Sequence, residues 1–244
     1  MMFLCVRMNS AENGEKVSEL KLAIFDCDGT LVDSQHAIFR SMSGAFTRYG
    51  LANLSHESVR RIIGLSLHNA ISVLVPEAND DLIENLCLAY SDEWKKIRAI
   101  ENLQEPLFPG TLDAINALED AGWLLGVATG KSYNGVVATL SFYGILDKFV
   151  TIQTSDKVVH GKPNPEMILA ALNEANVDKS NTFMIGDTTF DIDMAINAGV
   201  RAIGVNWGYH DASELMASGA QRVINEFNEL QSALTDADNM KTVI

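Results

Sequence analysis

The sequence has few cysteines, few basic residues and no long hydrophobic run. Its three cysteines, Cys5, Cys27 and Cys87, are far apart and form no CxxC pair, so neither a zinc site nor a disulfide framework is indicated. This cysteine usage predicts a reducing, cytoplasmic setting. No apolar stretch reaches the ~18 residues that a membrane span requires, so we expect no membrane-embedded segment.

Positive charge is also scarce. The chain of 244 residues has 18 Lys and Arg against 32 Asp and Glu, a formal net charge of -14. An acidic surface repels the phosphate backbone of nucleic acids and the headgroups of anionic membranes, so we expect neither as a partner. An anionic substrate would need local positive charge from a metal ion or a well-placed lysine.

The sequence does contain a series of short apolar runs, and most of them end in a polar residue. Continuous apolar runs of this length are typical of buried parallel strands. Amphipathic helical patterns separate the later runs, and the alternation predicts an α/β fold with a doubly wound, Rossmann-like parallel sheet. The predicted strands are residues 20–25, 124–129, 149–155, 182–187 and 202–208.

Residues 35–102 have a different pattern, with several helical stretches and no convincing strand. They lie between the first two predicted strands, where a crossover in a parallel sheet needs only one helix. We therefore predict an all-helical domain inserted into a core formed by residues 18–34 and 103–235. The first 17 residues are polar after a short apolar start, and their composition predicts a flexible N-terminal extension.

Polar residues that carry chemistry follow the predicted strands or lie in the loops between them. Carboxyl ends of parallel strands meet in one crevice, so we expect these side chains to come together. Four carboxylates in one crevice repel one another unless a cation lies among them. Because no His or Cys cluster accompanies them, Mg2+ is the ion that fits. The residues are Asp26, Asp28, Thr129, Gly130, Lys162, Asp187 and Asp191.

A phosphate group is the expected ligand beside this ion. The Thr129 hydroxyl, the Gly130 amide and the Lys162 ammonium are suitable donors to phosphate oxygens. A metal ion, a lysine, a hydroxyl and a spare carboxylate are the groups that phosphoryl transfer requires.

Four motifs resemble those of the haloacid dehalogenase superfamily and occur in that family's order. FDCDGT at residues 25–30 resembles its DxDGT motif, and GVATG at 126–130 resembles its strand-end threonine motif. GKPNP at 161–165 resembles the lysine motif, and GDTTFD at 186–191 resembles GDxxxD. The helical insertion is similar to the cap of the subgroup that includes phosphoglycolate phosphatases and β-phosphoglucomutases.

The resemblance implies a catalytic role for each motif. Asp26 would be the nucleophile that forms an aspartyl-phosphate. Asp28 would be the general acid that protonates the leaving oxygen and the base that then activates water. Thr129 and Lys162 would hold and neutralise the phosphoryl group.

The resemblance also implies a Mg2+ site. Its ligands would be the carboxylates of Asp26 and Asp187 and the main-chain carbonyl of Asp28. Asp191 would either support the metal ligands or orient Lys162. As a structural alternative, Asp191 could cap the N-terminus of the helix that follows.

The motifs together predict a Mg2+-dependent phosphatase acting on a small phosphorylated metabolite, either phosphoglycolate-like or a sugar phosphate. Asp28 argues against a dehalogenase, because dehalogenases of this superfamily lack the second aspartate of the first motif. A phosphosugar mutase like β-phosphoglucomutase is an alternative, although Ile63 and Leu67 stand where a mutase would place cationic residues. A non-catalytic binding protein on the same fold is another alternative, and the intact motifs argue against it. The sequence does not indicate an oligomeric state.

Several residues beside the motifs are not assigned a catalytic role. Lys131 could approach a substrate or face solvent, and the sequence leaves both open. Trp207 and Tyr209 are expected to pack in the core rather than to line the site. His36 and His160 are expected to be structural or solvated.

Overall fold

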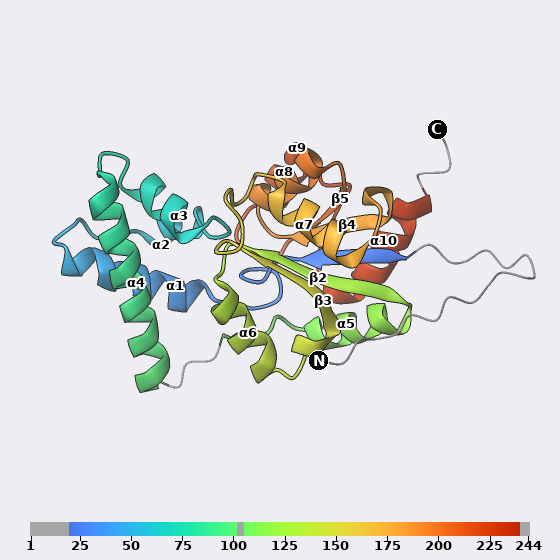
Figure 1. Cartoon of the computed structure of the whole chain (residues 1–244), viewed down its shortest axis with the longest axis horizontal. Helices are drawn as coiled ribbons and strands as arrows, with labels where there is room; N and C mark the ends of the chain where they lie inside the picture. The colour runs from blue at the N-terminus through green and yellow to red at the C-terminus, as the bar shows by residue number, and fades with distance from the viewer. Residues whose placement is uncertain (1–19, 102–104, 240–244) are drawn as a thin grey trace, which may run out of the picture.

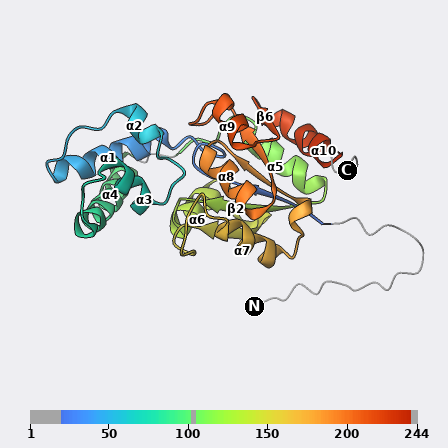
Figure 2. The same ribbon diagram turned by 90° about the horizontal axis from the view of Figure 1, so that it is seen from above.

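The computed structural model describes residues 20–101 and 105–239. In these ranges the chain forms one six-stranded parallel sheet with helices on both faces and a helical lobe at one side (Figures 1 and 2). The predicted N-terminal extension, residues 1–17, lies outside the described residues. The strands are β1 (Lys21–Phe25), β2 (Trp123–Thr129), β3 (Phe149–Thr154), β4 (Thr182–Gly186), β5 (Arg201–Val205) and β6 (Arg222–Ile224).

The strand order is β3-β2-β1-β4-β5-β6, and every neighbouring pair is parallel. This order confirms the predicted doubly wound, Rossmann-like fold. Strands β2 and β3 are added on one side of β1 and strands β4, β5 and β6 on the other, so the order of the strands reverses beside β1. The five predicted strands correspond to β1–β5, whereas the three-residue strand β6 was not predicted.

Both faces of the sheet are buried, which explains why its strands are continuous apolar runs. In β1, Ala23 and Phe25 point into one core cluster, whereas Leu22 and Ile24 point into the other. Side chains of α5 (Thr111–Asp120), α6 (Tyr133–Phe142) and α10 (Leu230–Asn239) pack in the first cluster. Side chains of α7 (Glu166–Ala175), α8 (Thr189–Ala198) and α9 (Ala212–Ser218) pack in the second. Short 3-10 turns occur at Leu146–Lys148, Lys179–Asn181 and Phe227–Glu229.

The helical lobe, residues 35–101, is inserted between β1 and β2. It consists of α1 (Gln35–Arg48), α2 (His56–Arg60), α3 (Leu67–Leu74) and α4 (Asp80–Glu101), and its residues form no strand. Met42, Phe46, Ile71 and Leu86 are among the buried residues of its own hydrophobic cluster. None of the helices in the described ranges combines the length and the hydrophobicity needed to cross a bilayer.

Specific polar contacts join the lobe to the sheet core. Arg61, directly after α2, donates two hydrogen bonds of 2.7 Å each to the Glu214 carboxylate in α9. Arg60 donates to the main-chain carbonyl of Gly208, at 3.2 Å. On the other side of the junction, a Cβ atom on Gly130 would lie 2.4 Å from the Leu65 carbonyl oxygen. The lobe loop at 62–66 therefore lies directly over the end of β2.

Candidate active site

Three aspartates from different motifs meet at the carboxyl ends of β1 and β4. Asp26 directly follows β1, Asp187 directly follows β4, and Asp191 lies in the first turn of α8. Each offers a carboxylate oxygen within 4.8 Å of the oxygens of the other two, and all three side chains are fully buried. Adjacent parallel strands bring these residues together, although Asp26 and Asp187 are far apart in the sequence.

A single buried lysine lies among these carboxylates. Lys162 Nζ is 2.8 Å from Asp26 Oδ1 and 2.6 Å from Asp191 Oδ1, as ion pairs rather than well-directed hydrogen bonds. Burial alone would lower the pKa of Lys162, but the carboxylates of Asp191 and Asp26 raise it above its ordinary value. The ammonium therefore stays charged, and one positive charge faces three carboxyl groups.

Burial and the excess of carboxyl groups both favour the protonated form of the aspartates in this cluster. Burial raises the pKa of Asp26 to about 7; Lys162 opposes this shift, and the Asp191 charge adds to it. Burial also raises the pKa of Asp187 well above its usual range, and the charges of Asp191 and Asp26 add to that effect. A further positive charge among these oxygens would oppose both shifts, because it stabilises the ionised carboxylates.

The donor set fits Mg2+. Asp26 Oδ1 accepts a hydrogen bond of 2.7 Å from the Cys27 amide, whereas Asp26 Oδ2 is buried without a hydrogen-bond partner among the described residues. Oxygen ligands, an uncommitted carboxylate oxygen and excess negative charge are what a hard divalent cation requires. The carboxylates of Asp26 and Asp187 could hold the ion.

Asp187 is held by two donors, and sequence reasoning identified neither as its partner. The Thr30 hydroxyl donates to Asp187 Oδ1 at 2.8 Å, and the main-chain amide of Tyr209 donates to Oδ2 at 2.9 Å. Thr30 belongs to the first motif, which is a signal the sequence does contain. No motif in the sequence points to the Tyr209 amide. The Tyr209 side chain was expected to pack in the core, and it is buried in the hydrophobic cluster of the helical lobe.

Two glycines let the backbone approach Asp187 closely. A Cβ atom on Gly208 would lie 2.2 Å from the Asp187 Cβ, and one on Gly29 would lie 2.3 Å from Asp187 Oδ2. Gly29 also has a φ of +88°, a conformation that side chains disfavour. Both positions therefore require glycine for the carboxylate to keep its place.

Asp191 makes both kinds of contact that the sequence left open. Its Oδ2 accepts hydrogen bonds from the Thr188 amide at 3.0 Å and from the Thr188 hydroxyl at 2.7 Å, which caps α8. Its Oδ1 is the atom that pairs with Lys162. One carboxylate thus holds the helix N-terminus with one oxygen and the lysine with the other.

Asp28 belongs to a second charged group beside the first. Lys131 Nζ lies 2.8 Å from Asp28 Oδ1 and 2.6 Å from Glu105 Oε1, and the Thr139 hydroxyl donates to Glu105 Oε2 at 3.0 Å. Burial alone would lower the pKa of Lys131, but the carboxylates of Asp28 and Glu105 raise it well above its ordinary value. The sequence left open whether Lys131 approaches the substrate or faces solvent. In the structure its ammonium pairs with Asp28 and Glu105, and we infer that it orients the Asp28 carboxyl group. Sequence reasoning did not identify Glu105.

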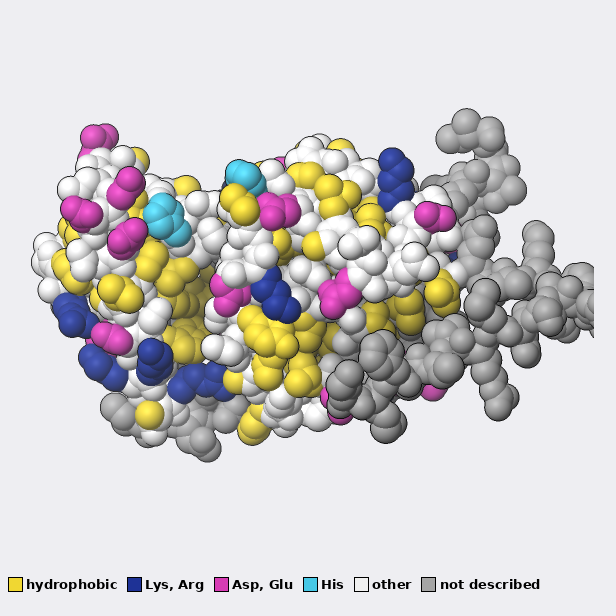
Figure 3. Space-filling model, in the orientation of Figure 1, with side chains coloured by type: hydrophobic (Ala, Val, Ile, Leu, Met, Phe, Trp, Pro, Cys, Tyr) yellow, Lys and Arg dark blue, Asp and Glu magenta, His cyan; other side chains and the backbone are white. Residues whose placement is uncertain are grey.

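A pocket of about 720 Å³ lies between the helical lobe and the core and adjoins this second group. Asp28, Thr129, Gly130 and Lys131 line it from the core side. The Lys131 amide donates to the Thr129 hydroxyl at 3.3 Å. Figure 3 shows the hollow between the two parts of the molecule, with hydrophobic side chains on its walls.

The predicted site residues thus fall into two adjoining groups. Asp26, Lys162, Asp187 and Asp191 form the buried cluster, whereas Asp28, Thr129 and Gly130 line the pocket beside it. His36 and His160, which were expected to be structural or solvated, belong to neither group. His36 is exposed, and the exposed His160 ring lies 3.3 Å from Glu166.

Comparisons with known proteins agree with the motifs. A family model described as haloacid dehalogenase-like hydrolase matches residues 23–205. The protein named Probable phosphatase IndB from Dickeya dadantii is 33% identical over 213 residues, covering 87% of this chain and 92% of that protein. A phosphoglycolate phosphatase from Agrobacterium fabrum is 31% identical over 221 residues, covering 87% and 91%.

A solved structure has the same fold over nearly the whole chain. It is described as a haloacid dehalogenase-like hydrolase from Bacteroides fragilis, with a TM-score of 0.81 and 29% identity. The match covers 87% of this chain and 100% of that chain.

Proposed function

Because the chain belongs to the haloacid dehalogenase-like hydrolase family, we propose that it is a Mg2+-dependent phosphatase that hydrolyses small phosphate monoesters through an aspartyl-phosphate on Asp26. The observation that carries the proposal is the buried cluster, in which Asp26 has one oxygen held by Lys162 and the other uncommitted. The two named phosphatases that cover most of the chain support the same reaction class. A cytoplasmic location, expected from the cysteine usage, is part of the proposal.

In the first step, a carboxylate oxygen of Asp26 attacks phosphorus and the bond to the ester oxygen breaks. Asp28 pairs with Lys131 as a carboxylate in this structure, so it must take up a proton when the ester binds; it gives that proton to the leaving oxygen, and the alcohol departs neutral. Asp28 is two residues from the nucleophile and lines the pocket, where the leaving group would lie. Lys131 holds its carboxyl group in a fixed orientation.

In the second step, water attacks the phosphorus of the aspartyl-phosphate and the bond to Asp26 breaks. Asp28, now without its proton, accepts one from that water, and inorganic phosphate leaves. Lys162 and the Thr129 hydroxyl would neutralise and hold the phosphoryl oxygens in both steps. Mg2+, held by Asp26, Asp187 and the Asp28 carbonyl, would supply further positive charge to those oxygens.

The helical lobe would act as a cap over the site. Its loop lies directly over Gly130, and the Arg61–Glu214 pair ties it to the core. A cap in this position would exclude bulk water while the aspartyl-phosphate forms. Its loop presents Ile63 and Leu65 to the pocket, which favours hydrolysis over a mutase that must hold a bis-phosphorylated sugar.

The experiment is phosphate release from a panel of small esters, with Mg2+ and then with excess EDTA. We expect release that requires Mg2+, and we expect Asp26→Asn to abolish it while the protein stays folded. Asp33→Asn is the matched control, because it is the same chemical change at an exposed position shortly after the first motif. If Asp26→Asn kept near-full activity, Asp26 would not be the nucleophile. Isomerisation of a hexose phosphate without phosphate release would instead favour the mutase.

A further inference from the structure

The pocket beside Asp28 is walled mainly by apolar side chains of the helical lobe. They come from α1, from the loop at 62–66, from α3 and from α4, so the leaving group of a bound ester would meet hydrophobic surface on several sides. A hydroxyl placed against such a wall loses its water without gaining a partner, which is costly. The apolar lining residues include Ile38, Met42, Ile63, Leu65, Tyr90 and Trp94.

One face of α4 gives this wall an aromatic surface. Tyr90 and Trp94 are four residues apart and therefore lie on the same side of the helix. Their rings are stacked, with centroids 5.9 Å apart, and both residues line the pocket. The Lys131 ammonium, which pairs with Asp28, lies 5.1 Å from the centroid of the Trp94 ring. The aromatic surface therefore begins next to Asp28.

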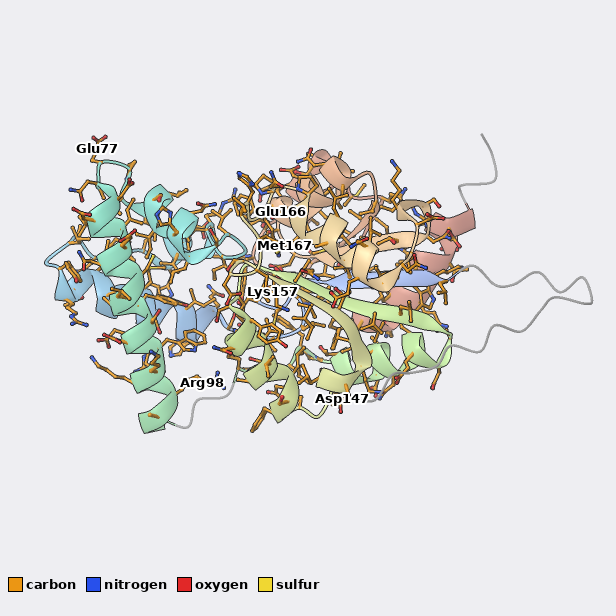
Figure 4. The ribbon with its side chains drawn as sticks, viewed as in Figure 1. Glu77, Arg98, Asp147, Lys157, Glu166 and Met167 are labelled. Atoms are coloured by element: carbon orange, nitrogen blue, oxygen red, sulfur yellow. The ribbon has the colours of Figure 1, made fainter. Side chains whose placement is uncertain are left out.

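The same face ends in a cationic group. Arg98 follows Trp94 by four residues, and Lys95 is adjacent to Trp94; both line the pocket. In Figure 4, Arg98 lies at the lower end of α4, on the side that faces the core. No carboxylate of the described ranges forms an ion pair with either side chain. Lys131, by contrast, is fully committed to Asp28 and Glu105.

We propose that the preferred substrate is a phosphate monoester whose leaving alcohol has an aromatic or alkyl body and an anionic group at its far end. The body would pack on Tyr90 and Trp94, and the anion would pair with Arg98 and Lys95. The proposal rests on the proposed phosphatase function and specifies its substrate class. The sequence predicts a glycolate-like or sugar leaving group. Glycolate is too short to cover this wall, and a sugar would place against it those hydroxyls that do not reach Ser91, Ser132 or Asn134 elsewhere in the lining.

The charges of the protein support an anion at that end of the pocket. The chain carries a formal net charge of -14, yet one end of the pocket has two cations that form no ion pair with a carboxylate of the described residues. An anion on the substrate would be repelled by most of the surface and attracted there. Such an arrangement selects for orientation as well as affinity, because only one end of the substrate can face Asp28.

The test compares four primary alkyl phosphates, so that the leaving alcohols have similar reactivity: benzyl phosphate, 4-carboxybenzyl phosphate, 2-phosphoglycolate and glucose 6-phosphate. We expect kcat/KM for benzyl phosphate to exceed that for 2-phosphoglycolate by about 10-fold or more, the effect of a few buried carbon atoms. We expect the carboxyl group to add a further twofold to fivefold, about what a partly exposed ion pair contributes.

Variants then assign the selectivity to residues. Arg98→Gln should abolish the preference for the carboxylated over the plain benzyl ester, and Trp94→Leu should reduce the preference for benzyl phosphate over 2-phosphoglycolate. Lys96→Gln is the matched control: it is on the same helix, pairs with Glu93 at 2.6 Å, and does not line the pocket. Both ratios should be unchanged in Lys96→Gln.

The outcomes separate the two proposals. Mg2+-dependent hydrolysis that favours 2-phosphoglycolate or glucose 6-phosphate over both benzyl esters would overturn the substrate class and leave the phosphatase intact. Hydrolysis of none of the four esters by folded, Mg2+-loaded protein would overturn both. Equal loss of the carboxylate preference in Arg98→Gln and Lys96→Gln would show that general charge, not this pocket, sets the selectivity.

Discussion

The ion pairs of Lys131 with Asp28 and Glu105 should contribute measurably to the free energy of unfolding. The Lys131 ammonium lies between Asp28 and Glu105, and the three side chains are 8%, 12% and 5% exposed. Lys131→Met keeps much of the aliphatic stem but leaves two nearly buried carboxylates without their shared cation. Breaking a buried ion pair by removing one partner costs about 3–5 kcal/mol, because the remaining charge is left uncompensated.

The assay is thermal unfolding of the wild type and the variant at pH 7.5. For a chain of this size, each kcal/mol corresponds to a Tm change of roughly 2–4 °C, so we expect Lys131→Met to melt about 6–20 °C lower. We also expect kcat to fall by up to the ~10²–10⁴-fold that a positioned general acid contributes, since Asp28 loses the group that orients it.

Two variants make the Lys131 result decisive. Lys96→Met removes an exposed pair, with side chains 58% and 23% exposed, and should cost at most about 1 kcal/mol. Adding Glu105→Gln to Lys131→Met removes one of the two uncompensated charges and should restore part of the lost stability. If Lys131→Met destabilised the protein no more than Lys96→Met does, the pairing with Asp28 and Glu105 would have no energetic role and the reasoning would be refuted.

Two further predictions concern the loop and the acidic cluster. Gly130→Ala would place a Cβ atom 2.4 Å from the Leu65 carbonyl oxygen and displace the lobe loop. We therefore expect kcat/KM to fall by roughly 10–100-fold. Gly161→Ala is the control: its Cβ atom would have its nearest contact at 3.6 Å, so kcat/KM should change little. Because the pKa values of Asp26 and Asp187 are raised above those of the unfolded chain, folding takes up protons between the unfolded and folded values. In EDTA, the urea midpoint should therefore rise as the pH is lowered from about 8 to 5, and a flat or opposite slope would contradict the shifts.

The sheet could be predicted because both of its faces are buried. Strands β1, β2, β4 and β5 are apolar along nearly their full length, whereas β3 also contains Thr151, Gln153 and Thr154. Because helices separate the later strands, the local sequence predicts a parallel sheet. Strand β6 escaped prediction because it has three residues, of which two are partly exposed. A segment that short gives no periodic signal of its own.

The convergence of the acidic residues could also be predicted, because parallel strands end at the same edge. What could not be predicted are partners set by the tertiary path of the chain. Glu105 enters the site from the return of the lobe to the core, and the Tyr209 amide reaches Asp187 from the loop after β5. Neither contact depends on a motif. The same holds for Tyr90 and Trp94, whose helical spacing is visible in the sequence but whose orientation toward the pocket is not.

Asp191 is the residue whose two roles can be separated by experiment. Asp191→Asn keeps an oxygen that can accept from Thr188, so the cap of α8 should persist, but it removes the charge that pairs with Lys162. Asp191→Ala removes both, including the hydrogen bonds from the N-cap residue Thr188. We expect it to be less stable than Asp191→Asn by about 0.5–1.5 kcal/mol, the usual net contribution of a hydrogen bond.

If orienting Lys162 is what catalysis requires of Asp191, the Asn and Ala variants should lose activity to a similar extent despite their different stabilities. The Asn variant should also weaken the pH dependence of unfolding in EDTA, because the Asp191 charge is one cause of the raised pKa values of Asp26 and Asp187. Wild-type activity in Asp191→Asn would instead mean that this carboxylate serves the helix alone, and that Asp26 by itself holds Lys162 in its catalytic position.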